Sequence, residues 1–94
     1  MNNEYTIIDF WAKWCGPCKQ FVPIFDTLSN TLSSAKLTFE KVNVDDDPDR
    51  AATNNVMTLP TVILYHNGKE VNRLVGKSVT KDKVIDLLKP IAGI

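Results

Sequence analysis

The residues of this sequence best suited to chemistry are two cysteines, Cys15 and Cys18, separated by Gly16 and Pro17. Two cysteines in 94 residues could form a structural disulfide, contribute half of a metal site, lie as inert thiols in the core or work as a redox pair. A zinc site needs four ligands, and the one histidine, His66, stands alone in an expected hairpin turn. The Cys-x-x-Cys spacing favours the redox pair over these alternatives.

A strand and a helix are predicted to meet at the two cysteines. Residues 5–11 are β-branched or aromatic on both alternating faces, a pattern typical of a central strand covered on two sides. Apolar residues then recur every three or four positions, which predicts a helix from Cys18 to about residues 33–34. Sites in open α/β sheets form at the carboxyl ends of such strands. We therefore expect the cysteine pair at a functional junction.

The two cysteines are expected to play different roles. A helix N-terminus offers unpaired N–H groups and the positive end of the helix dipole, which favour a thiolate at Cys15. Cys15 is thus predicted to be the partly exposed nucleophile. Cys18, one turn into the helix, is predicted to lie deeper and to act as the resolving thiol, with Gly16 and Pro17 forming the tight turn between them.

The remaining pattern predicts an α/β fold with a four-stranded mixed sheet, element order β-α-β-α-β-β-α, and helices on both faces. The strand at 37–44 should be parallel to the first, because a helix connects them. Asn67-Gly68 between two apolar runs predicts an antiparallel hairpin. The other expected elements are a short helix capped by Asp47 and ending near Asn55, hairpin strands at 61–65 and 70–75, and a last helix capped by Thr80.

Composition bounds the partners and the compartment. Eleven basic residues balance eleven acidic ones, which gives no electrostatic reason to expect nucleic acid or an anionic membrane as a partner. No apolar run approaches the roughly 20 residues of a membrane span. The start, residues 1–5, lacks the basic region of a secretory signal. We expect one domain over residues 1–94, a monomer, in the cytoplasm.

Residues 9–19, Asp9-Phe10-Trp11-Ala12-Lys13-Trp14-Cys15-Gly16-Pro17-Cys18-Lys19, closely resemble the thioredoxin family, as do Leu59-Pro60-Thr61 and Val75-Gly76 further along. The resemblance runs from about residue 5 to the C-terminus and implies a thioredoxin fold. We expect a trimmed one, because only about four residues precede the strand that carries Asp9, where the family normally has an additional strand and helix. The strand at 37–44 then becomes a sheet edge, which Glu40 and Lys41 are expected to blunt.

The resemblance also implies roles for other residues. Burial of Asp9 in an apolar strand should raise its pKa, and the resemblance makes it the acceptor of the Cys18 proton rather than a structural acid. The Leu59–Pro60 bond should be cis and face the cysteines, and the adjoining backbone should pair with a substrate peptide. The alternative is that Pro60 only marks the start of a strand. A docking surface for other proteins is expected to consist of Trp14, Leu59, Pro60, Val75 and Gly76. The alternative for Trp14 is packing on the protein's own surface. Trp11 is expected to pack within the protein.

Together these features predict a protein-disulfide reductase that uses dithiol–disulfide exchange. The resemblance implies electrons from NADPH through a separate thioredoxin reductase, and no bound cofactor. A calcium loop around Asp45, Asp47 and Asp49 is not supported, because Arg50 and Val56 occupy its sixth and twelfth positions. Two alternatives remain: a glutaredoxin-like, glutathione-coupled enzyme, against which Gly16-Pro17 and Trp14 argue, and a binding scaffold that barely turns over.

Overall fold

The computed structural model describes residues 4–93; Met1, Asn2 and Asn3, which contribute to the expected lack of a secretory signal, lie outside them. Its centre is a mixed sheet with the strand order β2-β1-β3-β4. β1 and β2 are parallel, whereas β3 is antiparallel to both β1 and β4. The elements are β1 (Tyr5–Trp11), α1 (Gly16–Leu32), β2 (Leu37–Asn43), α2 (Pro48–Thr53), β3 (Thr61–His66), β4 (Lys69–Val75), a 3-10 turn (Gly76–Ser78) and α3 (Lys81–Ala92).

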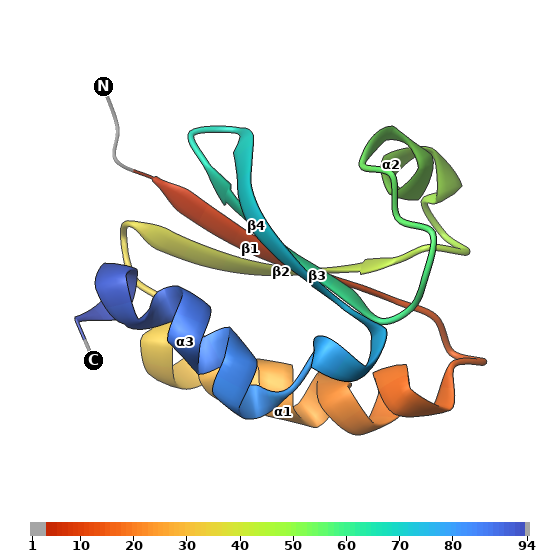
Figure 1. The fold of residues 1–94 in the computed structure, drawn as a ribbon, viewed down its shortest axis with the longest axis horizontal. Helices are drawn as coiled ribbons and strands as arrows, with labels where there is room; N and C mark the ends of the chain where they lie inside the picture. The colour runs from red at the N-terminus through yellow and green to blue at the C-terminus, as the bar shows by residue number, and fades with distance from the viewer. Residues whose placement is uncertain (1–3, 94) are drawn as a thin grey trace.

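Helices cover both faces of this sheet, as the sequence predicts. α1 and α3 lie side by side on one face, and α2 lies over the end of the other (Figure 1). The larger core, under α1 and α3, is built around Ile7, Phe25 and Leu88. The smaller core, on the α2 side, contains Ile8 and Phe10. Because Ile7 and Ile8 alternate along β1, the central strand contributes to both cores.

The element boundaries differ from the predicted ones by a few residues. α1 begins at Gly16, two residues before the predicted start, because Cys15 is its N-cap. β2 ends at Asn43 rather than Val44, and α2 ends at Thr53 rather than near Asn55. The two predicted caps are confirmed: Asp47 accepts a hydrogen bond from the Arg50 N–H at 3.2 Å, and Thr80 accepts one from the Lys83 N–H at 3.2 Å.

The hairpin is tighter than predicted. β3 and β4 extend to His66 and Lys69, so only Asn67 and Gly68 form the turn, with φ values of 52° and 86°. Two positive φ angles are typical of the type I′ turn, whose twist matches that of the flanking strands. His66 is therefore the last residue of β3 and not part of the turn; its ring stacks on Tyr5 at a centroid distance of 4.1 Å.

β2 is an edge strand, as expected, but Glu40 and Lys41 lie on opposite faces of it. Glu40 forms a bidentate ion pair with Arg50 of α2. The Lys41 ammonium lies 2.7 Å from a carboxylate oxygen of Asp26, on α1. Side chains of a strand alternate between the faces, so these two residues tie the edge strand to the helices above and below it.

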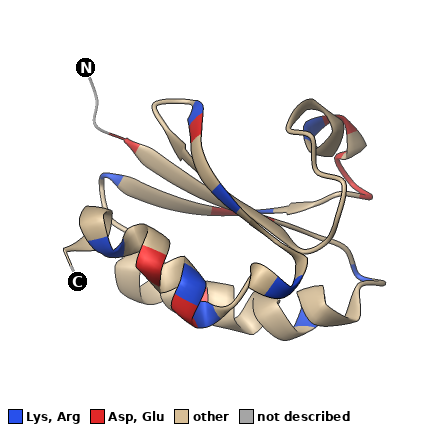
Figure 2. Ribbon diagram, viewed as in Figure 1, with Lys and Arg blue, Asp and Glu red and all other residues tan. Residues whose placement is uncertain are grey.

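Charged residues are spread over the helices and strands, with an acidic segment immediately before α2 (Figure 2). Within residues 4–93, no helix has both the length and the apolar character needed to cross a membrane.

Candidate functional site

The loop between β1 and α1 holds the two cysteines at the carboxyl end of a central strand. The Cys15 N–H donates a hydrogen bond to the Ala12 carbonyl at 3.2 Å. As N-cap of α1, Cys15 has extended backbone, and its sulfur accepts a hydrogen bond from the Cys18 N–H at 3.2 Å. Pro17 fits the first helical turn, where a missing N–H costs nothing. The junction predicted from the sequence is thus present.

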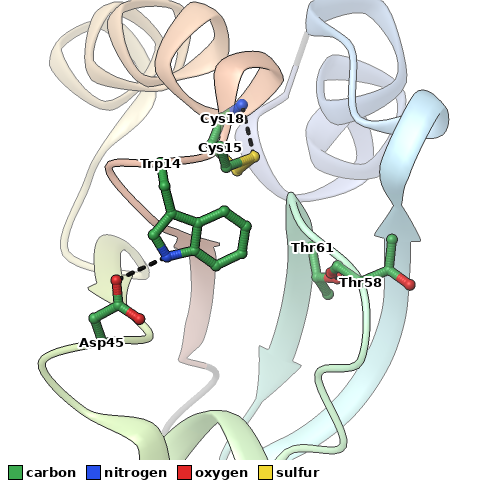
Figure 3. The surroundings of a disulfide bond; sticks show 6 residues. All are labelled: Trp14, Cys15, Cys18, Asp45, Thr58 and Thr61. Atoms are coloured by element: carbon green, nitrogen blue, oxygen red, sulfur yellow. Dashed lines mark hydrogen bonds between the residues drawn. A yellow bond between two sulfur atoms is a disulfide. The ribbon is translucent and has the colours of Figure 1, made fainter.

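Cys15 and Cys18 form a disulfide with a Cα–Cα distance of 5.2 Å (Figure 3). Cys15 keeps 7% of its surface accessible, whereas Cys18 is fully buried against Ala12. The order of exposure agrees with the prediction, although Cys15 is less exposed than expected. Trp11 packs against the same small cluster, as predicted.

Asp9 is the one acid of the described residues that lies fully buried. Neither of its carboxylate oxygens has a hydrogen-bond partner within residues 4–93. Burial disfavours the charged form and raises the pKa of Asp9 from 3.8 to about 7. The positive charge of Lys41 lowers this pKa, and the negative charge of Asp26 raises it by a smaller amount. Such a group can exchange a proton near neutral pH.

Two charged side chains on neighbouring elements accompany Asp9. Lys41 is its partner in the register of β1 and β2, so both side chains lie on the same face of the sheet. On that face Lys41 pairs with Asp26 of α1. Nothing in the sequence indicates Asp26, because its proximity to Lys41 depends on how α1 lies on the sheet.

The loop before β3 contains the predicted proline. The peptide bond between Leu59 and Pro60 is cis, the isomer that the resemblance implies. The Gly76 N–H donates to the Pro60 carbonyl at 2.8 Å, and the Thr61 hydroxyl donates to the Thr58 carbonyl. These two bonds fix the loop to the start of β3 and to the segment that follows β4.

Trp14 is 70% exposed beside the disulfide. Its indole N–H donates a hydrogen bond of 2.9 Å to a carboxylate oxygen of Asp45, on the loop after β2 (Figure 3). The ring is therefore both exposed and fixed in orientation. In the sequence Asp45 stands among the acids that lead into α2, and nothing there indicates its bond to Trp14.

An apolar recess of about 330 Å³ lies next to Trp14. Its lining includes Leu59 and Met57, and Met57 is 91% exposed although it is apolar. A second recess, of about 270 Å³, contains Pro17 and Gly76. The predicted docking residues are thus divided between two recesses, with Val75 exposed and Pro60 buried. Sequence inspection does not single out Met57, since exposure of one apolar loop residue has no local signature.

No set of three or more His, Cys, Asp or Glu side chains in residues 4–93 is arranged to hold a metal ion. Asp47 instead caps α2, and Asp45 accepts the hydrogen bond from Trp14.

The Cys-x-x-Cys disulfide lies at a helix N-terminus, follows a strand that carries a buried acid, and packs against Leu59 of the cis-proline loop. These features define a site for dithiol–disulfide exchange. The thioredoxin family model matches residues 1–90. The chain is 48% identical over 85 residues to thioredoxin of Mycoplasma genitalium, covering 90% of this chain and 80% of that one. It is 45% identical over 83 residues to thioredoxin of Chlamydia caviae, covering 88% and 78%.

Solved structures give the same result. A thioredoxin of Malassezia sympodialis superposes with a TM-score of 0.85 at 32% identity, covering 97% of this chain and 77% of that one. A thioredoxin of Plasmodium falciparum gives a TM-score of 0.84 at 36% identity, covering 96% and 84%. The chain belongs to the thioredoxin family. It is a thiol–disulfide oxidoreductase whose redox-active group is the Cys15–Cys18 pair.

Proposed function

We propose that Cys15 is the nucleophile and Cys18 the resolving thiol in the reduction of disulfides on target proteins. The Cys15 thiolate attacks one sulfur of the target disulfide, forms a mixed disulfide and releases one target thiolate, which takes a proton from solvent. Cys18 then loses its proton, and its thiolate attacks the Cys15 sulfur. The second target thiolate leaves, so two electrons pass from the cysteine pair to the target.

The single observation that carries this assignment is the different placement of the two sulfurs. Cys15 is the N-cap of α1, where the N–H groups of the first turn favour its thiolate, and it is the sulfur with some exposure. Cys18 has no accessible surface, so an incoming disulfide can reach Cys15 but not Cys18.

Asp9 is proposed as the acceptor of the Cys18 proton. A buried carboxyl with a pKa of about 7 is half ionised near neutral pH, so it can take a proton from a thiol and return it later. Asp9 lies on the strand that leads into the cysteine loop, and its oxygens are not engaged by any other group within residues 4–93.

The docking surface is proposed to consist of Trp14, Leu59, Pro60, Val75 and Gly76, with an extended target segment pairing with the backbone next to Pro60. Trp14 and Leu59 line one apolar recess and Gly76 another. Val75 is exposed beside them. An exposed apolar surface of this kind suits contact with many different target proteins.

We further propose that the chain works as one domain and as a monomer in the cytoplasm, without a bound cofactor. A separate thioredoxin reductase would restore the dithiol with electrons from NADPH. A protein of Mycobacterium leprae named bifunctional thioredoxin reductase/thioredoxin matches this chain at 39% identity over 75 residues, and its name supports a reductase as the partner.

The assignment of the two cysteines is tested by trapping. With Cys18→Ser, the mixed disulfide cannot be resolved, so incubation with a disulfide-containing protein should give a covalent adduct on a non-reducing gel that dithiothreitol releases. Cys15→Ser is the matched control and should give none. An adduct with Cys15→Ser but not with Cys18→Ser would reverse the roles.

A redox titration should give a two-electron transition near the roughly −270 mV that is the reference value for thioredoxin itself.

A further inference from the structure

Three charged side chains from three elements meet on the α1 face of the sheet. Asp9 lies on β1, Lys41 is its register partner on β2, and Asp26 lies on α1. The Lys41 ammonium has an Asp26 carboxylate oxygen at 2.7 Å, whereas neither oxygen of Asp9 has a hydrogen-bond partner within residues 4–93. The lysine therefore binds the outer acid and leaves the inner one unpaired.

Charge alone would favour an ion pair between Lys41 and the buried Asp9 carboxylate. Lys41 instead pairs with Asp26. An ammonium in direct contact with Asp9 would stabilise its carboxylate and abolish its ability to hold a proton near neutral pH. Asp26 and Lys41 are both partly exposed, so the ion pair between them contributes little to stability, on the order of 0–1 kcal/mol. Stability alone thus gives little reason for this pair.

We propose that Asp26 is a positioning residue that holds the Lys41 ammonium away from the Asp9 carboxyl and so keeps Asp9 able to exchange a proton with Cys18. The proposal rests on the proposed role of Asp9. Asp26 acts through Lys41, and its own negative charge adds a smaller repulsion in the same direction.

Within residues 4–93, no charged group other than Lys41 and Asp26 acts on the pKa of Asp9. Its partner on β3 is Val62, and the buried residues of α3 are Val84 and Leu88. Lys41 and Asp26 are the charged groups that act on the pKa of Asp9. Replacing Asp26 should therefore change the titration of Asp9 with few side effects from other groups.

The first test is the titration of Asp9 itself, followed by the ¹³C signal of its carboxyl carbon between pH 4 and 9. In Asp26→Asn the ammonium is released toward Asp9, so the midpoint should fall by roughly 0.5–1 pH unit. Asp26→Glu keeps the carboxylate and should hold the midpoint near the wild-type value. Asp86→Asn removes an exposed acid that pairs with Lys89 on α3 at 3.3 Å, and it should leave the midpoint unchanged.

A double substitution separates positioning from direct repulsion. In Lys41→Met no ammonium remains to be moved, so adding Asp26→Asn should lower the Asp9 midpoint by less than it does in the wild type. An equal shift in both backgrounds, or no shift from Asp26→Asn, would overturn the proposal.

The kinetics distinguish this proposal from the proposed function. A mixed disulfide between Cys15 and thionitrobenzoate is prepared, and release of the coloured thiol by Cys18 is followed against pH. The acidic limb of this pH–rate profile should move to lower pH in Asp26→Asn, together with the titration midpoint of Asp9. If the midpoint moves and the rate profile does not, the positioning role stands and the role of Asp9 as proton acceptor is wrong.

Discussion

Asp9 links the chemistry of the site to the stability of the fold. In the native state it keeps its proton up to about pH 7, whereas in the unfolded chain it releases it near 3.8. The native state therefore binds more protons between these two values, and its stability falls as pH rises from about 4 to about 7. A shift of this size corresponds to up to about 4 kcal/mol, all of it lost above pH 7.

Asp9→Asn should remove this pH dependence. Urea unfolding of the oxidised proteins is expected to give similar free energies of unfolding at pH 4. At pH 8 the variant should be more stable by up to about 4 kcal/mol, because it buries no carboxylate. Asp86→Asn, at an exposed ion pair, should change stability by little at either pH. A gap between wild type and Asp9→Asn that is the same at pH 4 and pH 8 would contradict the raised pKa.

At the residue level, the site residues that can be predicted from the sequence are those that depend on local spacing. Cys15 and Cys18 follow from a four-residue motif, and Asp9 follows from one acid in an apolar strand. Asp26 and Asp45 could not be found in this way. Asp26 meets Lys41 only because α1 packs on the sheet, and Asp45 meets Trp14 across 31 positions of the chain. Neither contact has a counterpart in the local pattern.

Among the elements, the hairpin is predicted well because its geometry depends on two residues. The type I′ turn requires positive φ at both of its central residues, and Asn67 and Gly68 adopt it, whereas few other residue pairs tolerate it. The start of α1 is predicted less accurately than those of α2 and α3, whose caps Asp47 and Thr80 are confirmed. The periodic apolar stripe of α1 begins after its first turn, so it cannot show that the helix starts at Gly16, where capping by Cys15 decides. The ends of β2 and α2 differ from prediction because neither has a strong stop signal in the sequence.

Gly68→Ala should destabilise the hairpin through the backbone alone. A Cβ at Gly68 would meet nothing within 4 Å, but φ there is +86°, which costs an L-residue about 1 kcal/mol. Gly16→Ala is the matched control: a Cβ there also meets nothing within 4 Å, and the position lies in a helix, where alanine is favoured. Thermal unfolding should thus show a lower Tm for Gly68→Ala and an equal or higher one for Gly16→Ala. A loss of stability in both variants would argue against a purely conformational cause.

Across the whole molecule, the redox pair, the cis-proline loop and the apolar recesses share one end of the sheet, and the hairpin turn lies at the opposite end (Figure 1). This separation follows from the topology, since β1 ends at the cysteine loop while β3 begins there. Exposed large apolar side chains occur at both ends, with Met57 beside the redox site and Val71 on β4 near the turn. Those near the disulfide are placed to contact a target that is covalently held at Cys15.

Met57→Ser should therefore lower kcat/KM for a protein disulfide, and Val71→Ser should not. Partial burial of the Met57 side chain against a target is worth about 1 kcal/mol, or roughly a fivefold loss when it is removed. Val71 is a suitable control because it is also apolar and exposed, at 55%, but belongs to the other end of the sheet. Initial rates with a protein disulfide at substrate concentrations below KM measure the ratio directly. An unchanged ratio in Met57→Ser, or an equal loss in Val71→Ser, would contradict a docking role for Met57.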